Sequence, residues 1–498
     1  MSIRLRAPLA PALLAAAAVA ILSAAFALAS TGVYYDDDLA HYMIARFAWR
    51  HPELFLNTWG RPGFTILYAP AAALGFVPAR LFSALLAGAT ALAAAYLAHL
   101  HGVQRGWLAA LLTGAQPEFL RQGFSTLTEL VFALLLALCL IAARRARWAG
   151  LALVAGWLPL ARYESLPLVA IFGVLLLLKG QWRLLPLLVL PLLVQNSFYA
   201  LREGNPALLL FPLDQALGVR ASAPNFDYGT GDPLYYLHRA PLAYGPAIFA
   251  LACLGMARAR PGLLQISVLT MLAVLSLTYW LLPGAGVAGY IRHLAMVAPA
   301  VGVLAAIGLE RSAAPLAQAS APGWLIPLLG AGLALWLGLQ TMYAGALVAI
   351  AGAVLPAVPH AAPRVAEATI LALGALAVVT AALPVRPFQL VEEQQTAIAA
   401  GQWLAASPYG ARFTLGSHIW QQYAAGLDPY DPARFRGITP AEVEAAPPGT
   451  VIVWDSHYSH RLVWNTPLAL LQDPRRFRLL KAWEQPTFQL YIFEKTAP

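Results

Sequence analysis

Residues 8–42 read PLAPALLAAAAVAILSAAFALASTGVYYDDDLAHY, a long apolar run followed at once by three consecutive aspartates. The apolar part is long enough to cross the hydrocarbon core of a bilayer as a helix. Because it exceeds the apolar region of a signal peptide, we expect an uncleaved first membrane span. Asp36, Asp37 and Asp38 then lie where the chain first leaves the membrane. Three adjacent like charges are costly unless water, a cation or a basic partner offsets them.

The composition of the whole chain extends this prediction. Its 498 residues are 60% hydrophobic and 11% charged, and apolar runs of about 20 residues recur along it, which predicts a polytopic α-helical membrane protein. The net charge of +9 fits the Lys and Arg of cytoplasmic loops and does not indicate a nucleic-acid-binding surface. Cys139 and Cys253 lie inside apolar runs, which argues against a disulfide framework.

The lengths of the apolar runs predict a membrane domain over residues 1–385 and the positions of its spans. Basic residues in the loops indicate which side of the membrane each loop occupies. After the first span we expect others at about 79–100, 107–119, 124–143, 148–162, 165–178, 184–201, 241–257, 262–282, 290–309, 322–339, 341–357 and 365–384. Residues 64–77 are apolar but short, and Pro70 interrupts them, so we expect an interfacial helix there. With the N-terminus cytoplasmic, every inner loop carries Lys or Arg, as the positive-inside rule requires. The layout has about thirteen spans and an extracytoplasmic C-terminus.

In this layout the first outer loop, 31–78, and a second long loop, 202–240, lie on the same side of the membrane. Long loops without regular structure are often functional. Polar residues that need a partner or a water-filled cavity at the membrane surface gather on that side. They are His41, Tyr42, Arg61, Glu129, Arg162, Glu164, Asp232, Tyr290, Arg292 and His293.

These residue types suit chemistry at a phosphate group. A carboxylate among Asp36–Asp38 can act as a general base toward a hydroxyl, or can hold a divalent cation such as Mg²⁺ or Mn²⁺. Arg61 and Arg292 are able to bind a phosphate through two parallel hydrogen bonds each. The structural alternative makes both arginines interface anchors, and makes Arg162 and Glu164 a local ion pair.

Residues 386–498 differ in character, because charged residues, Trp, Tyr and His return there. Residues 449–455 are typical of a buried strand that enters a loop, and residues 488–493 alternate as a strand does. We therefore expect a small extracytoplasmic α/β domain at the C-terminus. His457 and His460 form a loose His-x-x-His motif, which more often packs or lies on a surface than binds a metal.

Several short motifs follow one another on the outer side of this layout. They are Asp37-Asp38 with Tyr42, Arg61-Pro62-Gly63, Gly75–Arg80, Thr128-Glu129, Arg162-Tyr163-Glu164 and Tyr290–Pro299. In this order they resemble the GT-C superfamily of polyprenyl-phosphate-sugar-dependent glycosyltransferases. The branch of the protein O-mannosyltransferases and the lipid A aminoarabinose transferases is the most similar. Those relatives often carry Asp-Glu where this chain has Asp-Asp, and Lys or His with Pro-Pro where it has Arg-Pro-Gly, which leaves sugar and acceptor open.

The resemblance implies a GT-C-like fold in the inner or plasma membrane. It also implies an inverting transfer of a hexosyl or pentosyl group from an undecaprenyl- or dolichyl-phosphate donor to a hydroxyl of a glycan, lipid or protein. Asp37, or else Asp36 or Asp38, would deprotonate the acceptor. Arg61 and Arg292, with His293, would stabilise the departing lipid phosphate, since cations must meet its growing negative charge.

Two other classes of function stay open on the sequence. A transporter or flippase of a lipid-linked sugar would also use acids and arginines near the membrane, although no inverted repeat of broken spans is evident. A non-catalytic binding protein on the same fold is the second. Within the enzymes, an oligosaccharide ligase would need a larger acceptor groove. The sequence identifies no certain cofactor and does not determine the oligomeric state.

Overall fold

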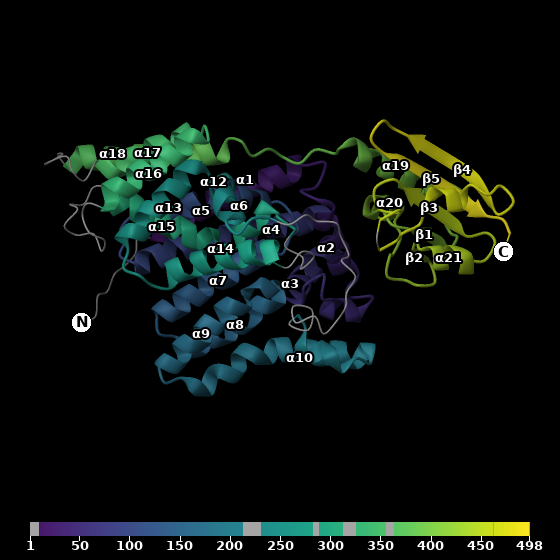
Figure 1. Cartoon of the computed structure of the whole chain (residues 1–498), viewed down its shortest axis with the longest axis horizontal. Helices are drawn as coiled ribbons and strands as arrows, with labels where there is room; N and C mark the ends of the chain where they lie inside the picture. Colours follow the sequence, from purple (N-terminus) through teal and green to yellow (C-terminus); the bar gives the residue numbers. More distant parts are fainter. Residues whose placement is uncertain are drawn as a thin grey trace.

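The computed structural model describes residues 9–212, 231–281, 288–311, 325–354, 363–461 and 463–497. Figure 1 shows a helical body that holds the N-terminal part and a smaller α/β domain that holds the C-terminus, at opposite ends of the long axis. An extended segment joins α18 (Pro363–Ala382) to α19 (Glu392–Ala406) and so connects the two parts (Figure 1). We call residues 392–497 the C-terminal domain and the preceding helices the body. The expected boundary at residue 385 stays a prediction.

The body consists of α-helices joined by short connections and by 3₁₀-helices. Its helices, besides α18, are α1 (Leu9–Ala29), α2 (Asp36–Phe47), α3 (Pro62–Ala73), α4 (Phe76–Leu100), α5 (Gly106–Gly114), α6 (Pro117–Gln122), α7 (Glu129–Arg144), α8 (Trp148–Ala161), α9 (Leu166–Leu178), α10 (Leu185–Glu203), α12 (Tyr235–Tyr244), α13 (Pro246–Arg258), α14 (Leu263–Leu281), α15 (Ala298–Arg311), α16 (Leu325–Leu339) and α17 (Tyr343–Val354). The 3₁₀-helices are η1 (Pro52–Leu56), η2 (Tyr163–Ser165), η3 (Trp182–Leu184), η4 (Pro206–Leu210) and η5 (Ile291–Val297).

Most of the expected spans coincide with these helices, but their number is not confirmed. Among the described residues, five helical stretches are long and apolar enough to cross a membrane, or six if the bent pair of α12 and α13 counts as one span. That pair bends by 115° at Gly245, whose φ of +82° stands next to Pro246, a combination that interrupts a helix. The expected span at 107–119 divides into α5 and α6 because Pro117 starts a new helix. Part of the expected long loop at 202–240 lies outside the described residues.

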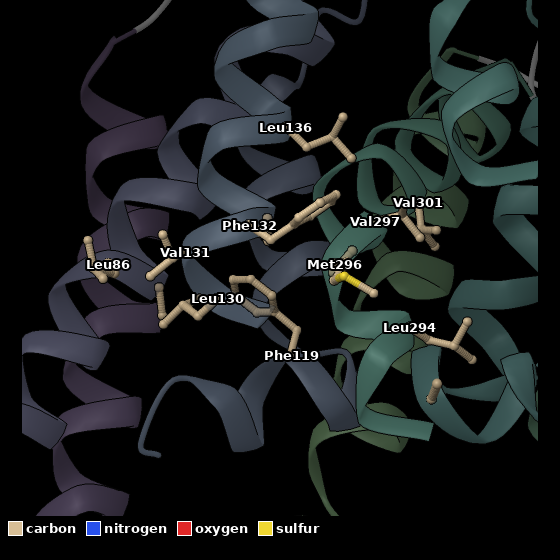
Figure 2. Packing of buried hydrophobic residues seen from close by; sticks show 14 of the residues in the cluster. Leu86, Phe119, Leu130, Val131, Phe132, Leu136, Leu294, Met296, Val297 and Val301 are labelled. Atoms are coloured by element: carbon tan, nitrogen blue, oxygen red, sulfur yellow. The ribbon is translucent and has the colours of Figure 1, made fainter. Parts of the chain in front are cut away.

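The centre of the body is α15, which is almost wholly buried. It packs on α13 at a close approach: a Cβ at Gly255 would lie 1.9 Å from the carbonyl oxygen of Leu304, and one at Gly308 would lie 2.0 Å from that of Leu251. Figure 2 shows the neighbouring core, where apolar side chains of α6, α7, η5 and α15 interdigitate. Dense apolar packing of this kind fixes the helix ends that carry the polar residues described below.

The C-terminal domain is built on a five-stranded sheet with the order β2-β1-β3-β5-β4. Its strands are β1 (Thr414–Gly416), β2 (Phe435–Gly437), β3 (Val451–Asp455), β4 (Phe477–Glu484) and β5 (Gln489–Lys495). β2, β1 and β3 are parallel, whereas β5 is antiparallel to β3 and β4. Besides α19, its helices are α20 (Ile419–Ala424), α21 (Pro440–Ala445) and the 3₁₀-helix η8 (Leu468–Leu471). The sheet confirms the expected small C-terminal α/β fold, and β3 and β5 confirm the two expected strands.

Candidate functional site

The three consecutive aspartates form the first turn of α2 and point in three directions. Successive side chains on a helix are about 100° apart around its axis, so three consecutive residues face different neighbours. Asp38 faces the body, Asp37 faces η5, and Asp36 faces the C-terminal domain. Figure 1 shows why: α2 lies at the end of the body nearest the C-terminal domain. The acidic triplet is therefore three separate sites.

Asp38 is fully buried and fixes the start of α2 in the body. Its Oδ1 accepts hydrogen bonds from the backbone N–H of Thr126, at 2.6 Å, and from the hydroxyl of Thr126, at 2.5 Å. Its Oδ2 lies 3.4 Å from Nη2 of Arg80, which is also buried. With both oxygens engaged by protein groups, Asp38 has the surroundings of a structural carboxylate.

Asp37 pairs with Arg292 of η5, whose Nη2 donates to Oδ2 of Asp37 at 2.5 Å. The Asp37 side chain is 36% exposed, whereas that of Arg292 is 5% exposed. Burial acts to raise the pKa of Asp37, but the guanidinium of Arg292 outweighs it and holds the pKa below its ordinary value. Asp37 is thus an ionised carboxylate that other molecules are able to reach.

Behind Arg292 lies a cluster of buried charges. Glu129 Oε1 is 3.5 Å from Nε of Arg292 and 3.4 Å from Nη1 of Arg162. Arg162 Nη2 donates to Glu164 at 2.5 Å and to Nε2 of His293 at 3.0 Å. Because Nε2 of His293 accepts this bond, His293 is neutral with its proton on Nδ1. Buried charges at such distances require this mutual pairing.

Two nitrogens of Arg292 make no hydrogen bond to a described residue. Nε and Nη1 of this buried side chain both lack a hydrogen-bond partner in that part of the chain, although Nε lies 3.5 Å from Oε1 of Glu129. A buried guanidinium N–H without an acceptor is rare, because leaving it unpaired costs free energy. It marks a position where an external acceptor such as a phosphate oxygen would be stabilised.

Arg61 approaches the cluster from the N-terminus of α3. Cζ of its guanidinium lies 4.1 Å from the ring centroid of Tyr163. Its Nη1 donates a hydrogen bond to the carbonyl oxygen of Thr58 at 3.1 Å. Among the described residues it has no ion pair within 4.0 Å. Its φ of +59° lies in the left-handed region, which is strained for a residue with a Cβ. Strained residues of this kind cluster at functional sites.

His41 follows Asp37 by one helical turn and lies on the same side of α2. Burial lowers the pKa of His41 to about 3, so its ring is neutral. The indole of Trp59 stacks on that ring at 4.4 Å, and no described residue forms a hydrogen bond with Nδ1 of His41. Tyr290 joins the site from the other side, where its ring lies 4.6 Å from the Arg292 guanidinium.

Two expected site residues lie apart from these contacts. The ring of Tyr42 packs against the rings of Phe76 and Tyr423, with distances of 4.8 and 6.1 Å between ring centroids. Asp232 is 54% exposed, caps the N–H of Leu234 at 2.8 Å and lies 3.9 Å from His238. Asp36 and Asp38 face other partners, whereas the remaining expected residues lie around Asp37 and the buried charge cluster.

Sequence reasoning missed the partners of the outer two aspartates. Arg80 and Thr126 hold Asp38, while Trp420 and Tyr458 of the C-terminal domain donate to Asp36 at 3.1 and 2.7 Å. Arg80 is the last residue of the Gly75–Arg80 motif, so the sequence held a signal that could have placed it at the site. Nothing in the sequence links Trp420 or Tyr458 to a residue more than 380 positions away.

A cation bound by Asp36–Asp38 together would have to displace these separate partners. A different group of donors is closer together: Asp36, Glu393 and His418 offer one oxygen or nitrogen each within 4.8 Å of one another. Glu393 already accepts hydrogen bonds from His418 and His457, and Asp36 accepts hydrogen bonds from Trp420 and Tyr458. The expected divalent cation stays a prediction.

No model of a known protein family matches the chain, and no curated protein matches it in sequence. Two solved structures of ArnT from Cupriavidus metallidurans do match in three dimensions. The apo structure has a TM-score of 0.54 at 17% identity, and the structure bound to undecaprenyl phosphate has a TM-score of 0.55 at 14% identity. Each comparison covers 96% of this chain and 97% of ArnT. The chain therefore has the ArnT fold, which confirms at the level of the fold its resemblance to the GT-C superfamily.

Proposed function

We propose that the protein is an inverting glycosyltransferase that moves a sugar from a polyprenyl-phosphate donor to a hydroxyl acceptor. The observation that carries the proposal is the Asp37–Arg292 pair, in which an accessible carboxylate adjoins a buried guanidinium whose Nη1 makes no hydrogen bond to a described residue. The pair thus places a base in direct hydrogen-bond contact with a group that is able to bind phosphate. Binding of undecaprenyl phosphate by ArnT, which shares the fold, supports the choice of donor.

Asp37 is the proposed base. Its lowered pKa keeps it ionised at neutral pH, and its partial exposure lets an acceptor hydroxyl reach it. In the reaction, that hydroxyl gives its proton to Asp37 while its oxygen attacks the anomeric carbon of the sugar. The bond between the anomeric carbon and the phosphate oxygen breaks at the same time, so the configuration inverts.

Arg292 and Arg61 are the proposed ligands of the lipid phosphate. The leaving group changes from a phosphodiester to a monoester and gains negative charge, which nearby guanidinium groups stabilise. Nη1 of Arg292 is already oriented without a protein acceptor. A phosphate bound to Arg292 would offset part of the guanidinium charge that lowers the pKa of Asp37. The pKa of Asp37 would then rise, and Asp37 would become a stronger base in the bound state.

The remaining site residues fit supporting roles. Arg162, Glu129, Glu164 and His293 hold Arg292 in place through the buried charge cluster. His41 is neutral and has a free Nδ1 beneath the Trp59 indole, so it suits a hydroxyl of the donor sugar. The transfer would take place on the extracytoplasmic face, at the inner or plasma membrane. A divalent cation at Asp36–Asp38 would be revealed by loss of transfer in chelator and its recovery with Mg²⁺ or Mn²⁺.

The decisive experiment identifies products rather than binding alone. Lipids and glycans of a strain lacking the gene are compared by mass spectrometry with those of the complemented strain. The purified protein in vesicles then receives the polyprenyl-phosphate sugar that accumulates in the deletion strain. A glycosyltransferase forms a new glycosidic bond and releases one polyprenyl phosphate per sugar. Movement of intact sugar lipid across the bilayer without that release would contradict the proposal and indicate a flippase.

A further inference from the structure

The C-terminal domain holds α2 near both of its ends. At the N-terminal end, Trp420 Nε1 donates to Oδ1 of Asp36 at 3.1 Å and the Tyr458 hydroxyl donates to Oδ2 at 2.7 Å. Beyond the C-terminal end, Arg50 Nη1 and His51 Nε2 each lie 3.0 Å from Oδ2 of Asp428. The helix that carries Asp37 is therefore attached at two points to a domain that follows it by more than 340 residues.

The N-terminal attachment is the one that bears on the proposed reaction. Both oxygens of Asp36 accept hydrogen bonds from the C-terminal domain, and Asp36 is joined to Asp37 by a single peptide bond. We propose that Trp420 and Tyr458 are positioning residues that set the placement of the Asp37 carboxylate through Asp36. The inference rests on the function proposed above, because it assigns Asp37 the role of base.

Trp420 and Tyr458 are themselves braced by one carboxylate. Glu393 of α19 accepts a hydrogen bond from Nε2 of His418 at 2.9 Å and another from Nδ1 of His457. Nδ1 of His418 accepts the backbone N–H of Trp420 at 3.3 Å, and the ring of His457 stacks on that of Tyr458 at 4.0 Å. Trp420 and Tyr458 are thus each fixed by a histidine, and both histidines bond to Glu393. Gln394 of α19 also donates to Oδ1 of Asp36, at the longer distance of 3.5 Å.

The loop that presents Tyr458 is rigid for a further reason. The buried Asp455, at the end of β3, accepts the backbone N–H groups of His457 and Tyr458 at 2.9 and 2.7 Å. Its other oxygen accepts the hydroxyls of Ser417 and Ser459 at 2.6 and 3.1 Å. A carboxylate with four donors fixes the backbone on which Tyr458 stands.

Hydrogen bonds explain this cluster better than a metal ion does. A neutral histidine that ligates a metal through Nε2 must carry its proton on Nδ1. Nδ1 of His418 instead accepts an N–H, so Nε2 carries the proton that it donates to Glu393. Both oxygens of Asp36 are also occupied by hydrogen-bond donors. The group therefore has the donors and acceptors of a closed hydrogen-bond network.

The test measures Asp37 directly in the full-length protein reconstituted in nanodiscs. A hydrophobic carbodiimide labels carboxyl groups in their protonated form, and mass spectrometry gives the labelling rate of Asp37. Tyr458→Phe removes only the hydroxyl that holds Asp36. A matched control is Tyr491→Phe, which removes a hydroxyl that donates to Glu484 at 2.8 Å in the same domain.

We expect Tyr458→Phe and Trp420→Phe to raise the Asp37 labelling rate by about threefold or more. A change of less than about 1 kcal/mol in the free energy that favours the ionised form of Asp37 suffices for that factor. Tyr491→Phe should match the wild type. Undecaprenyl phosphate should still bind to all variants, because Arg292 and Arg61 are not altered. If sugar transfer is measured, kcat should fall in the two positioning variants while KM for the donor is kept.

Wild-type labelling of Asp37 in Tyr458→Phe would overturn the inference. One equivalent of tightly bound metal in the purified protein, lost in Glu393→Gln, would also overturn it. The labelling assay needs no substrate, so it separates the inference from the function it rests on. If the wild type transfers no sugar but Asp37 labelling responds to Tyr458→Phe, the proposed function fails and the positioning of Asp37 stands.

Discussion

Oδ2 of Asp37 accepts a hydrogen bond of 2.5 Å from Nη2 of Arg292, across 255 positions of the sequence. The two residues stand at the ends of different helical elements, α2 and η5. Their pairing places a carboxylate next to a guanidinium whose Nε and Nη1 make no hydrogen bond among the described residues. The proposed function depends on this pairing, which distinguishes Asp37 from its two acidic neighbours.

Asp38→Asn should lower stability. The substitution keeps an oxygen for Thr126 but removes the charge that faces the buried Arg80, and breaking a buried charge pair costs about 3 kcal/mol. Denaturant unfolding in detergent measures the loss. The control Asp473→Asn, in an exposed turn of the C-terminal domain, should stay within about 0.5 kcal/mol of the wild type. Equal stability of the two variants would contradict the structural assignment of Asp38.

Arg61→Gly and Arg61→Ala should differ in stability but not in activity. Both remove the guanidinium, so both should lose sugar transfer and bind undecaprenyl phosphate weakly. Glycine adopts a φ of +59° with less strain than alanine because it has no Cβ, and we expect the Gly variant to be more stable than the Ala variant by about 1 kcal/mol. Thermal unfolding of the two proteins provides the comparison. An alanine variant as stable as the glycine variant would show that the backbone there is not strained.

Arg292→Gln should weaken the binding of undecaprenyl phosphate by about tenfold or more, because the loss of one charge-assisted hydrogen bond is worth at least ~1.4 kcal/mol. Arg292→Lys should restore only part of the affinity, since an ammonium group cannot contact Asp37 and a phosphate through a planar fork. Arg202→Gln, at an exposed pair with Glu203, serves as the control. Unchanged affinity in Arg292→Gln would place the phosphate elsewhere.

The stability of the C-terminal domain should depend on acid pH through Glu393. Burial acts to raise the pKa of Glu393, but hydrogen bonds from His418 and His457 outweigh it and lower the pKa from 4.5 to about 2. A lowered pKa in the folded state stabilises the fold above the unfolded value of 4.5, and this contribution disappears as the pH falls toward 2. Thermal unfolding of the wild type and Glu393→Gln should therefore differ most at pH 6 and converge by about pH 2. A constant difference across that range would contradict this assignment.

Local pattern accounts for much of the fold. Apolar length located α4, α10, α14 and the continuous stretch of η5 and α15 to within three residues, and α7 to within five, because membrane spans are set by thickness and hydrophobicity. The buried run and the alternating run predicted β3 and β5. β1 and β2 have three residues each and give no periodic signal of their own.

The site was predictable in part for the same reason. A topology with alternating inner and outer loops puts Asp37, Arg61 and Arg292 on one side, and the structure brings Asp37 and Arg292 into contact. The sequence did not show that α2 begins at Asp36, so the divergence of the aspartates was not foreseen. The contacts of Asp36 with Trp420 and Tyr458 depend on tertiary packing between distant segments, which local pattern does not encode.

The most direct measurement is the rate of sugar transfer by Asp37→Asn in vesicles that contain the polyprenyl-phosphate donor. Asparagine keeps the size of the side chain but cannot accept the acceptor's proton, so we expect a loss of about a hundredfold or more while undecaprenyl phosphate binding persists. Asp473→Asn should transfer sugar at the wild-type rate. Undiminished transfer by folded Asp37→Asn would contradict the assignment of Asp37 as the base and with it the proposed mechanism of sugar transfer.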